Sequence, residues 1–272
     1  MNSPFVLSYE RSLLLSQPLR ESIIKSIVQS MQLPVSGSGL DIGCGLGDTT
    51  FALAEALGSE GRVVGLDAEE EFLQRARCLL QNKFAIKERI AFVQGDAKEL
   101  PFADKSFDWA FSMDCVGAIP VDQLILLKEV SRVVKHGGRV CLAIWSSQIL
   151  LPGYPLLEAQ LNATSAGIAP FAAGMTPERH IMRASAWFRQ AGFTDIRAQT
   201  LLSDVCPPLS NETIAALTDL FTMRWGNCEK EVAPEIWQNY QRLCNPNSDD
   251  FILHNPDYYA FFTYSLFSGR VM

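Results

Sequence analysis

The sequence predicts an α/β fold with a doubly wound parallel sheet, on three observations. Short apolar runs alternate with amphipathic helical stretches over residues 39–145, which is the pattern of βαβ units. A glycine-rich turn, residues 43–47, joins the first apolar run to a helical pattern. At 272 residues, with 48% hydrophobic and 19% charged side chains, the chain is long enough to bury a large core.

Apolar periodicity and turn residues predict the elements in chain order. Two N-terminal helices are expected, over about 3–15 and 17–32, and Pro34 with a Ser-Gly turn closes the second. The alternating part that follows contains strands at 39–44, 62–67, 90–94, 109–113 and 139–145, and helices at 48–57, 69–82 and 123–134.

After Trp145 the regular alternation ends. The remaining elements are a helix near 156–165, a helix over 183–191, a strand over 195–202, mostly helical residues 211–255 and a last strand over 258–268. We expect residues 1–150 to form a core with N-terminal helices. Residues 151–272 would complete the sheet, with two insertions, 151–178 and 206–257, forming a helical cap.

Charge and composition exclude several classes of protein. The net charge of −7, without any block of Lys or Arg, argues against a nucleic-acid partner. Residues 1–20 lack a secretory signal pattern, and no apolar run reaches about 18 residues, so no membrane span is expected. The seven cysteines form no C-x-x-C pair and the three histidines lie far apart. We therefore expect a cytoplasmic protein without a metal site.

The spacing of the glycines distinguishes between cofactors. A dinucleotide fingerprint needs G-x-G-x-x-G/A, and no registration of Gly43, Gly45 and Gly47 fits it. The chain reads D-x-G-x-G-x-G, starting at Asp41. Carboxylates at Asp41 and Asp48 would repel a pyrophosphate and would suit a ligand that carries an amine and a sulfonium.

With this loop the sequence resembles the class I S-adenosylmethionine-dependent methyltransferases, over almost the whole chain. Leu-Pro-Phe at 100–102 and Ser-Phe-Asp at 106–108 match a pattern common in the family and narrow the resemblance to a small-molecule branch similar to quinone-biosynthesis methyltransferases. The resemblance implies a Rossmann-like, seven-stranded, mostly parallel sheet whose last two strands form an antiparallel hairpin at its edge. It also implies the cofactor S-adenosyl-L-methionine, with S-adenosyl-L-homocysteine as product.

The resemblance places the methionine part of the cofactor on backbone around Gly43 and Gly45. Asp41 would orient the loop, Gly47 would complete it, and Cys44 would be a small filler rather than a nucleophile. Met113, at the end of the fourth strand, would pack on the adenosine or on the methionine chain.

The ends of the second and third strands supply the other expected cofactor contacts. Asp67 follows Gly47 by twenty residues, where an acidic side chain accepts hydrogen bonds from ribose hydroxyls. Ala68 and Phe72 would pack on the adenosine. In Gly95-Asp96-Ala97, the resemblance implies that Asp96 accepts from the adenine amine and that the N–H of Ala97 reaches a ring nitrogen.

Asp114 is the best-placed acid–base candidate, because it leaves the fourth strand where cofactor and substrate should meet. An ordinary loop cap is the alternative. His180 and His254 are weaker base candidates. His136 replaces the proline of a common K-P-G-G turn, which belongs at the opposite edge, so we expect it to be a surface residue.

Aromatic residues are denser in the second part of the chain, and we interpret the excess as a pocket for an apolar, ring-containing acceptor, although helix core explains some of it. Those of the cap are Tyr154, Phe171, Phe221, Trp225, Trp237, Tyr240 and Phe251. The predicted function is S-adenosylmethionine-dependent methylation (on O, C or N) of a small, apolar or aromatic acceptor. A non-catalytic S-adenosylmethionine-binding protein is the alternative. An NAD-dependent oxidoreductase is disfavoured by the glycine spacing. The sequence leaves the oligomeric state open.

Overall fold

The computed structural model describes residues 4–116, 122–168 and 176–272, with side chains from Arg11 onward. One sheet contains seven strands. They are β1 (Ser38–Ile42), β2 (Arg62–Asp67), β3 (Ile90–Gln94), β4 (Phe107–Met113), β5 (Val134–Ile149), β6 (Thr194–Val205) and β7 (Ala260–Arg270). Their order is β3-β2-β1-β4-β5-β7-β6, and β7 runs antiparallel to both of its neighbours. The predicted doubly wound, mostly parallel fold is confirmed.

The α-helices of the described residues are α1 (Pro4–Ser30), α2 (Asp48–Ala56), α3 (Glu70–Leu80), α4 (Gln123–Val133), α5 (Pro155–Asn162), α6 (Ala184–Gln190), α7 (Asn211–Trp225) and α8 (Pro234–Cys244). Short 3₁₀ helices lie at Lys87–Arg89, Pro177–Arg179, Ile181–Arg183 and Ile252–His254. Among these elements, none has both the length and the apolar character that crossing a bilayer would require.

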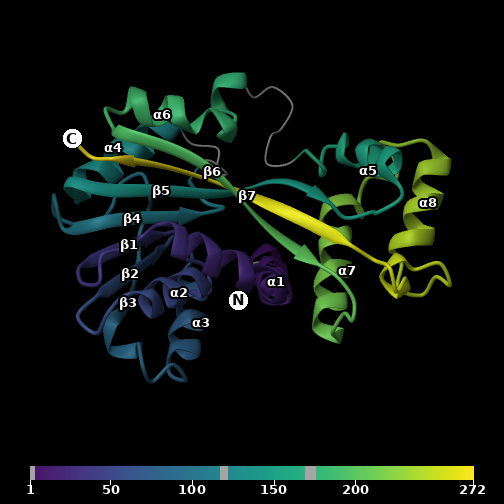
Figure 1. Cartoon of the computed structure of the whole chain (residues 1–272), viewed down its shortest axis with the longest axis horizontal. Coiled ribbons are helices and arrows are strands. Elements are labelled where there is room, and N and C mark those ends of the chain that lie inside the picture. The colour runs from purple at the N-terminus through teal and green to yellow at the C-terminus, as the bar shows by residue number, and fades with distance from the viewer. Residues whose placement is uncertain (1–3, 117–121, 169–175) are drawn as a thin grey trace.

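Two layers of helices cover the core of the sheet (Figure 1). Side chains alternate between the faces of each strand, as the twofold period of a strand requires. Trp109 and Phe111 of β4 therefore join the apolar cluster of α1 and α2, whereas Ala110 between them joins the cluster of α4 and α6. Both faces of the central strands are buried, which explains their nearly continuous apolar sequences.

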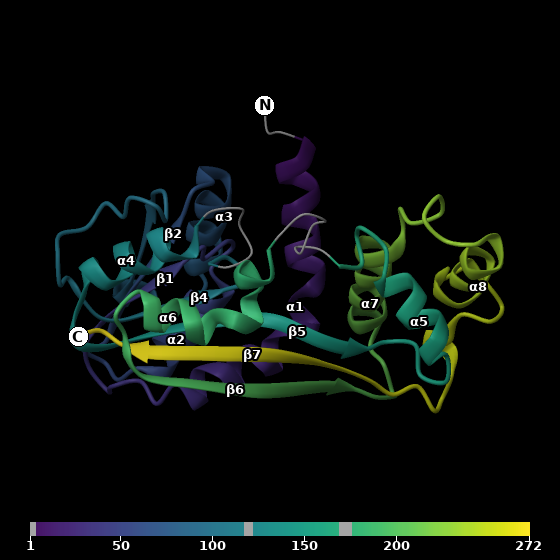
Figure 2. The same cartoon turned by 90° about the horizontal axis from the view of Figure 1, so that it is seen from above.

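Strands β5, β6 and β7 extend past the carboxyl end of β4 and carry a second, helical lobe (Figures 1 and 2). Helices α5, α7 and α8 form this lobe, beyond the carboxyl edge of the parallel strands. Strand β5 is longer than the predicted 139–145, because its pairing with β7 continues as far as Ile149 opposite Phe261. Tertiary pairing of this kind leaves no signal in the local sequence.

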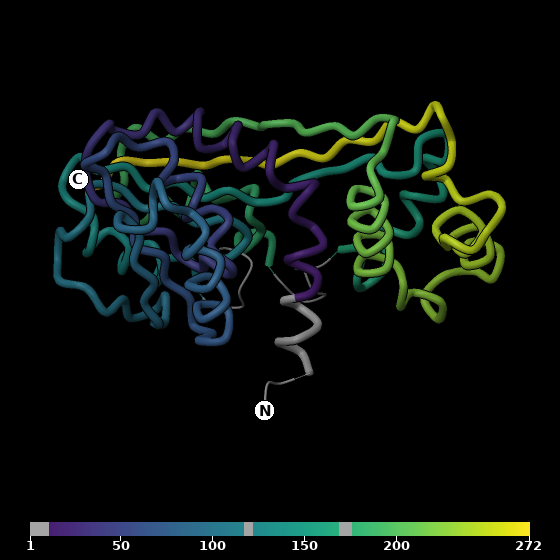
Figure 3. The backbone as a smooth tube through the Cα atoms, turned by 90° about the horizontal axis from the view of Figure 1, so that it is seen from below, coloured from purple at the N-terminus to yellow at the C-terminus, as the bar shows by residue number. Residues whose placement is uncertain are grey.

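The N-terminal segment is one helix, so the prediction of two helices is wrong. Pro18 lies inside α1, where proline costs about 3 kcal/mol relative to alanine. Pro18 is exposed, whereas Leu19, Ile23 and Ile27 after it are buried in the core. Their packing offsets the cost, and the helix continues between the core and α7 (Figure 3).

Most aromatic side chains of the lobe are buried in the apolar cluster that also contains residues of α1 and α2. Trp225 is fully buried, with its ring stacked 5.9 Å from that of Phe221 and edge-on to Tyr240. Its indole N–H donates to Asn162 Oδ1 at 3.1 Å. Phe251 is also buried, and Phe171 lies outside the described residues. The interpretation of Phe221, Trp225 and Tyr240 as the lining of an acceptor pocket is therefore wrong. Phe251 and Tyr154 do line a pocket of the lobe, with a volume of about 250 Å³, and its use by an acceptor stays a prediction.

Truncating Trp225 should unfold the lobe rather than impair an acceptor site. We expect Trp225→Ala to lower the free energy of unfolding by about 3–5 kcal/mol, because it leaves a cavity in a packed core. The matched variant Met223→Ala removes a side chain that is 55% exposed on the same helix, and it should stay within about 0.5 kcal/mol of the wild type. Urea unfolding followed by circular dichroism measures both, and equal effects would contradict this account.

Candidate functional site

The turn between β1 and α2 is built from three glycines in the left-handed region. The φ angles are 74° at Gly43, 53° at Gly45 and 90° at Gly47, a conformation that residues with a Cβ rarely adopt. A Cβ on Gly43 would collide with the side chain of Cys115, and one on Gly47 would press on the ring of Phe51. Local packing alone therefore accounts for Gly43 and Gly47.

Gly45 differs from the other two glycines because space remains beside it. The nearest atom to an added Cβ would be a methyl carbon of Leu13, at 3.6 Å, which is an ordinary contact distance. Packing does not require glycine at this position, although its positive φ favours it. Apart from its chain neighbours, this methyl carbon is the one described atom within 4 Å of the Cβ position at Gly45, so the turn is less crowded here than at Gly43 and Gly47.

Asp41, just before the turn, is fully buried. Its Oδ2 accepts hydrogen bonds from the hydroxyls of Thr49 and Thr50, both at 2.6 Å. Its Oδ1 is also buried and has no hydrogen-bond partner in the described part of the chain. Burial raises the pKa of Asp41 to about 6, although the hydrogen bonds from the two threonines lower it. The sequence analysis missed these threonines, although two hydroxyls in the first turn of α2 were a usable signal.

Asp67, at the end of β2, holds two loops together. Its Oδ2 accepts from the N–H of Gly45 at 2.8 Å, and its Oδ1 accepts from the N–H of Glu69 at 3.0 Å. The next residue, Ala68, is exposed at the same edge. A carboxylate has about four acceptor positions, so Asp67 can fix the glycine turn and still accept from a ligand.

Phe72 lies near the glycine turn but is covered by other side chains. It is 5% exposed and packs with Leu46 and with Leu13 and Leu14 of α1. Phe72 therefore presents little surface to a ligand, and its expected packing on an adenosine stays a prediction. Helix α1, which the sequence analysis did not place at this site, forms one wall beside the turn.

The residues after β3 reach the same edge of the sheet. The N–H of Gly95 donates to the carbonyl of Asp67 at 3.0 Å, which ties the two strand ends together. Asp96 is exposed, and its Oδ1 accepts from the N–H of Lys98 at 2.8 Å. That hydrogen bond, followed by one from the Lys98 side chain, lowers the pKa of Asp96. Ala97 packs, partly buried, against the core cluster of α4 and α6.

Asp114, just after the carboxyl end of β4, is hydrogen-bonded to residues of β5 and β7. Its Oδ2 accepts from the hydroxyl of Tyr264 at 2.7 Å, and its Oδ1 accepts from the N–H of Trp145 at 3.0 Å. Burial raises its pKa, and the positive charge of Arg20 on α1 opposes the rise. Met113, just before it, is buried. The sequence gave no sign of Tyr264 or Arg20 here, because both lie far away along the chain.

The three histidines have different surroundings. His136 is exposed at the amino end of β5, and its Nδ1 bonds to the carbonyl of Met272. His180 accepts from the N–H of Met182 at 3.2 Å, and His254 packs edge-on against Phe251 in the lobe. All seven cysteines are free. Within the described residues, no group of His, Cys, Asp or Glu could hold a metal ion.

The burial of Asp41 predicts a pH dependence of stability. Its folded-state pKa of about 6 lies above the ordinary 3.8, so its stabilising contribution is fully present below that ordinary value and is lost as the pH rises through about 6. Asp41→Asn stays neutral. Between about pH 4 and pH 7, the wild type should therefore lose about 3 kcal/mol relative to this variant.

Urea unfolding of the ligand-free proteins at several pH values measures that difference. The matched variant Asp257→Asn changes an exposed turn residue, and its difference from the wild type should be flat over the same range. A flat difference for Asp41→Asn as well would show that the buried carboxyl does not titrate as described.

Comparison with known proteins shows which sequences and folds the chain is similar to. Residues 40–138 match the family described as a methyltransferase domain. Demethylmenaquinone methyltransferase from Staphylococcus aureus is 38% identical over 135 residues, which cover 50% of this chain and 54% of that protein. The chain therefore spans about half the length of the curated relatives that it matches.

Solved structures share the fold over most of the chain. A SAM-dependent methyltransferase from Aquifex aeolicus superposes with a TM-score of 0.54 at 15% identity, covering 96% of this chain and 97% of that one. Phosphoethanolamine N-methyltransferase 2 from Haemonchus contortus, solved with S-adenosyl-L-methionine, has a TM-score of 0.54 at 19% identity and covers 92% of this chain and 52% of its own. Residues 40–138 are thus similar in sequence to methyltransferase domains, and the resemblance of the chain to class I S-adenosylmethionine-dependent methyltransferases is confirmed.

Proposed function

We propose that this chain is an S-adenosylmethionine-dependent methyltransferase that acts on a small, apolar or aromatic acceptor. The observation that carries the proposal is the glycine turn at the carboxyl edge of the sheet. There, the backbone at Gly45 is less crowded than at Gly43 and Gly47, and Asp41 behind it keeps a buried oxygen without a partner among the described residues. Such an edge is where α/β sheets bind nucleotide-like ligands.

The residues present fit this cofactor. A buried acceptor without a hydrogen bond costs about 1–3 kcal/mol, and the ammonium of a methionine moiety, directly or through water, would remove that cost at Asp41 Oδ1. Asp67 has acceptor positions left for ribose hydroxyls, and Asp96 is exposed and ionised beside it for an adenine amine. Carboxylates at these places suit a cationic ligand better than a pyrophosphate.

S-adenosyl-L-methionine, when bound, supplies a methyl group activated by the sulfonium and leaves as S-adenosyl-L-homocysteine. The protein then contributes orientation and exclusion of water. Gly43, Gly45 and Gly47 would contribute backbone atoms, with Cys44 as a filler between them. Leu13 and Leu14 of α1 pack against Leu46 and Phe72 beside the turn, and this apolar wall keeps water from it.

Asp114 would hold or remove a proton of the acceptor. A hydroxyl or carbon acid needs a base in order to become a nucleophile, whereas a neutral amine hardly does. Burial favours the protonated form of Asp114, which brings its pKa nearer to neutral. The hydrogen bonds from Tyr264 and Trp145 fix its position at the carboxyl edge.

The proposed acceptor class has its support in the relatives. A curated relative is named for the methylation of demethylmenaquinone, which suggests an apolar ring. The methylated atom, O, C or N, stays open. The negative net charge disfavours a nucleic-acid acceptor. Non-catalytic binding of S-adenosylmethionine is the alternative, and an NAD-dependent oxidoreductase would need a glycine spacing that this turn lacks.

Turnover in the presence of different acceptors tests the proposal. S-adenosylhomocysteine should be released from S-adenosylmethionine when a phenol, a quinol such as demethylmenaquinol, or an amine is a substrate. If Asp114 is the base, Asp114→Asn should slow hydroxyl or carbon acceptors about 100-fold or more and leave amines nearly unchanged. Asp257→Asn, in the lobe, should match the wild type. Binding of the cofactor without turnover by any acceptor would favour the non-catalytic alternative.

A further inference from the structure

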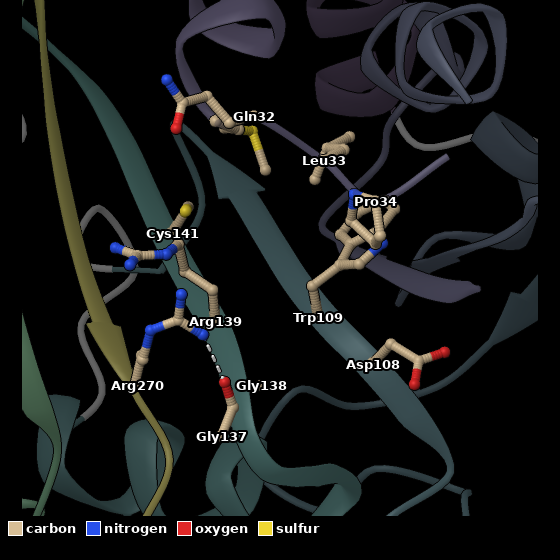
Figure 4. Close-up of a pocket in the computed structure, with 11 residues that line it drawn as sticks. Gln32, Leu33, Pro34, Asp108, Trp109, Gly137, Gly138, Arg139, Cys141 and Arg270 are labelled. Carbon is tan, nitrogen blue, oxygen red and sulfur yellow. Dashed lines mark hydrogen bonds between the residues drawn. The ribbon is translucent and has the colours of Figure 1, made fainter. Parts of the chain in front are cut away.

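A second pocket lies at the amino edge of the sheet, opposite the glycine turn. Its volume is about 270 Å³. The guanidiniums of Arg139 and Arg270 form one side, and Leu33, Pro34 and Trp109 form the other (Figure 4). Strands β1 and β4 both begin at this edge, and the glycine turn lies at the other end of β1. None of the candidate methyl-transfer residues lines the pocket.

The two arginines form a like-charge pair across neighbouring strands. Arg139 of β5 lies directly opposite Arg270 of β7 in the register, an arrangement that is destabilising without a counter-charge. Asp195 supplies one carboxylate, which accepts from Arg139 Nη2 at 2.7 Å and from Arg270 Nε at 3.3 Å. The same carboxylate also accepts from Arg197 at 2.9 Å. Three cations therefore share one anion.

The other carboxylate of the pocket does not offset this excess. Asp108 accepts from Lys135 Nζ at 2.7 Å and from the N–H of Ser38 at 2.8 Å. Figure 4 shows its carboxylate directed away from the two guanidiniums. The pocket is therefore positively charged on the side of Arg139 and Arg270.

Donors remain available on both arginines. A guanidinium has five N–H donors. Within the described residues, Arg139 uses two of them, on Asp195 and Ser268, and Arg270 uses two, on Asp195 and the carbonyl of Gly137. Access is open at the rim, because a Cβ added to Gly137 would meet nothing within 4 Å.

We propose that this pocket binds a small organic anion, with a carboxylate or phosphate group on an apolar body. Arg139 and Arg270 would bind the anionic group through charge-assisted hydrogen bonds. The apolar body would lie against Leu33, Pro34 and the edge of Trp109. This binding is separate from methyl transfer, since the pocket and the glycine turn lie at opposite edges of the sheet.

Calorimetric titration of the full chain with phenyl phosphate, phenylacetate and benzyl alcohol tests the proposal. At least one of the two anions should bind saturably and the neutral alcohol should not, whether or not excess S-adenosylhomocysteine is present. Arg270→Gln should weaken binding about 10-fold or more, as the loss of a charged hydrogen bond does. Leu33→Asp, which places a carboxylate on the opposite wall and leaves the arginines intact, should weaken it at least as much.

Arg197→Gln is the matched control. This variant removes one positive charge that contacts Asp195, as Arg270→Gln does, but at a residue that does not line the pocket. Its affinity for the anions should stay within about twofold of the wild type, because no contact with the ligand is lost. Equal weakening by Arg197→Gln and Arg270→Gln would overturn the proposal in favour of general electrostatic attraction. Absence of saturable binding by either anion, equal binding of the alcohol, or displacement by S-adenosylhomocysteine would also overturn it.

Discussion

The buried carboxylate of Asp41 is the constraint on which the cofactor edge depends. Two threonine hydroxyls in the first turn of α2 hold one of its oxygens, so the end of β1 and the start of the helix are fixed relative to each other. The chain between them must then turn within a few residues, and it does so through three glycines with positive φ. Asp67 secures the turn from the neighbouring strand through the N–H of Gly45.

The surroundings of the three glycines distinguish Gly45 from Gly43 and Gly47. Cys115 and Phe51 occupy the space where side chains at Gly43 and Gly47 would be, whereas a Cβ at Gly45 would meet only a methyl group of Leu13 at an ordinary contact distance. A sequence pattern alone treats all three alike. The pattern was therefore sufficient to locate the turn and to exclude a dinucleotide fingerprint, but the structure was needed to distinguish Gly45 from the two crowded positions.

Local patterns predicted the alternating core closely, because each strand there is buried on both faces and each helix has one apolar face. They failed where distant segments decide the structure. The sequence analysis placed a helix boundary near residue 16, yet α1 is continuous from Pro4 to Ser30, and the packing of Ile23 and Ile27 holds it against the core. The rings of Phe221 and Trp225 suggested a pocket, yet they are buried in the apolar core. Tyr264 and Arg20 reach Asp114 only through the fold.

Titration calorimetry of the ligand-free protein with S-adenosylhomocysteine and with NADH tests the central claim most directly, namely that the glycine turn is a site for S-adenosylmethionine. S-adenosylhomocysteine should bind at a single site and NADH should not bind. Asp67→Ala should weaken the binding of S-adenosylhomocysteine about 10- to 150-fold, as expected for the loss of a charged hydrogen bond. Binding of NADH without binding of S-adenosylhomocysteine, or unchanged affinity in Asp67→Ala, would contradict the account.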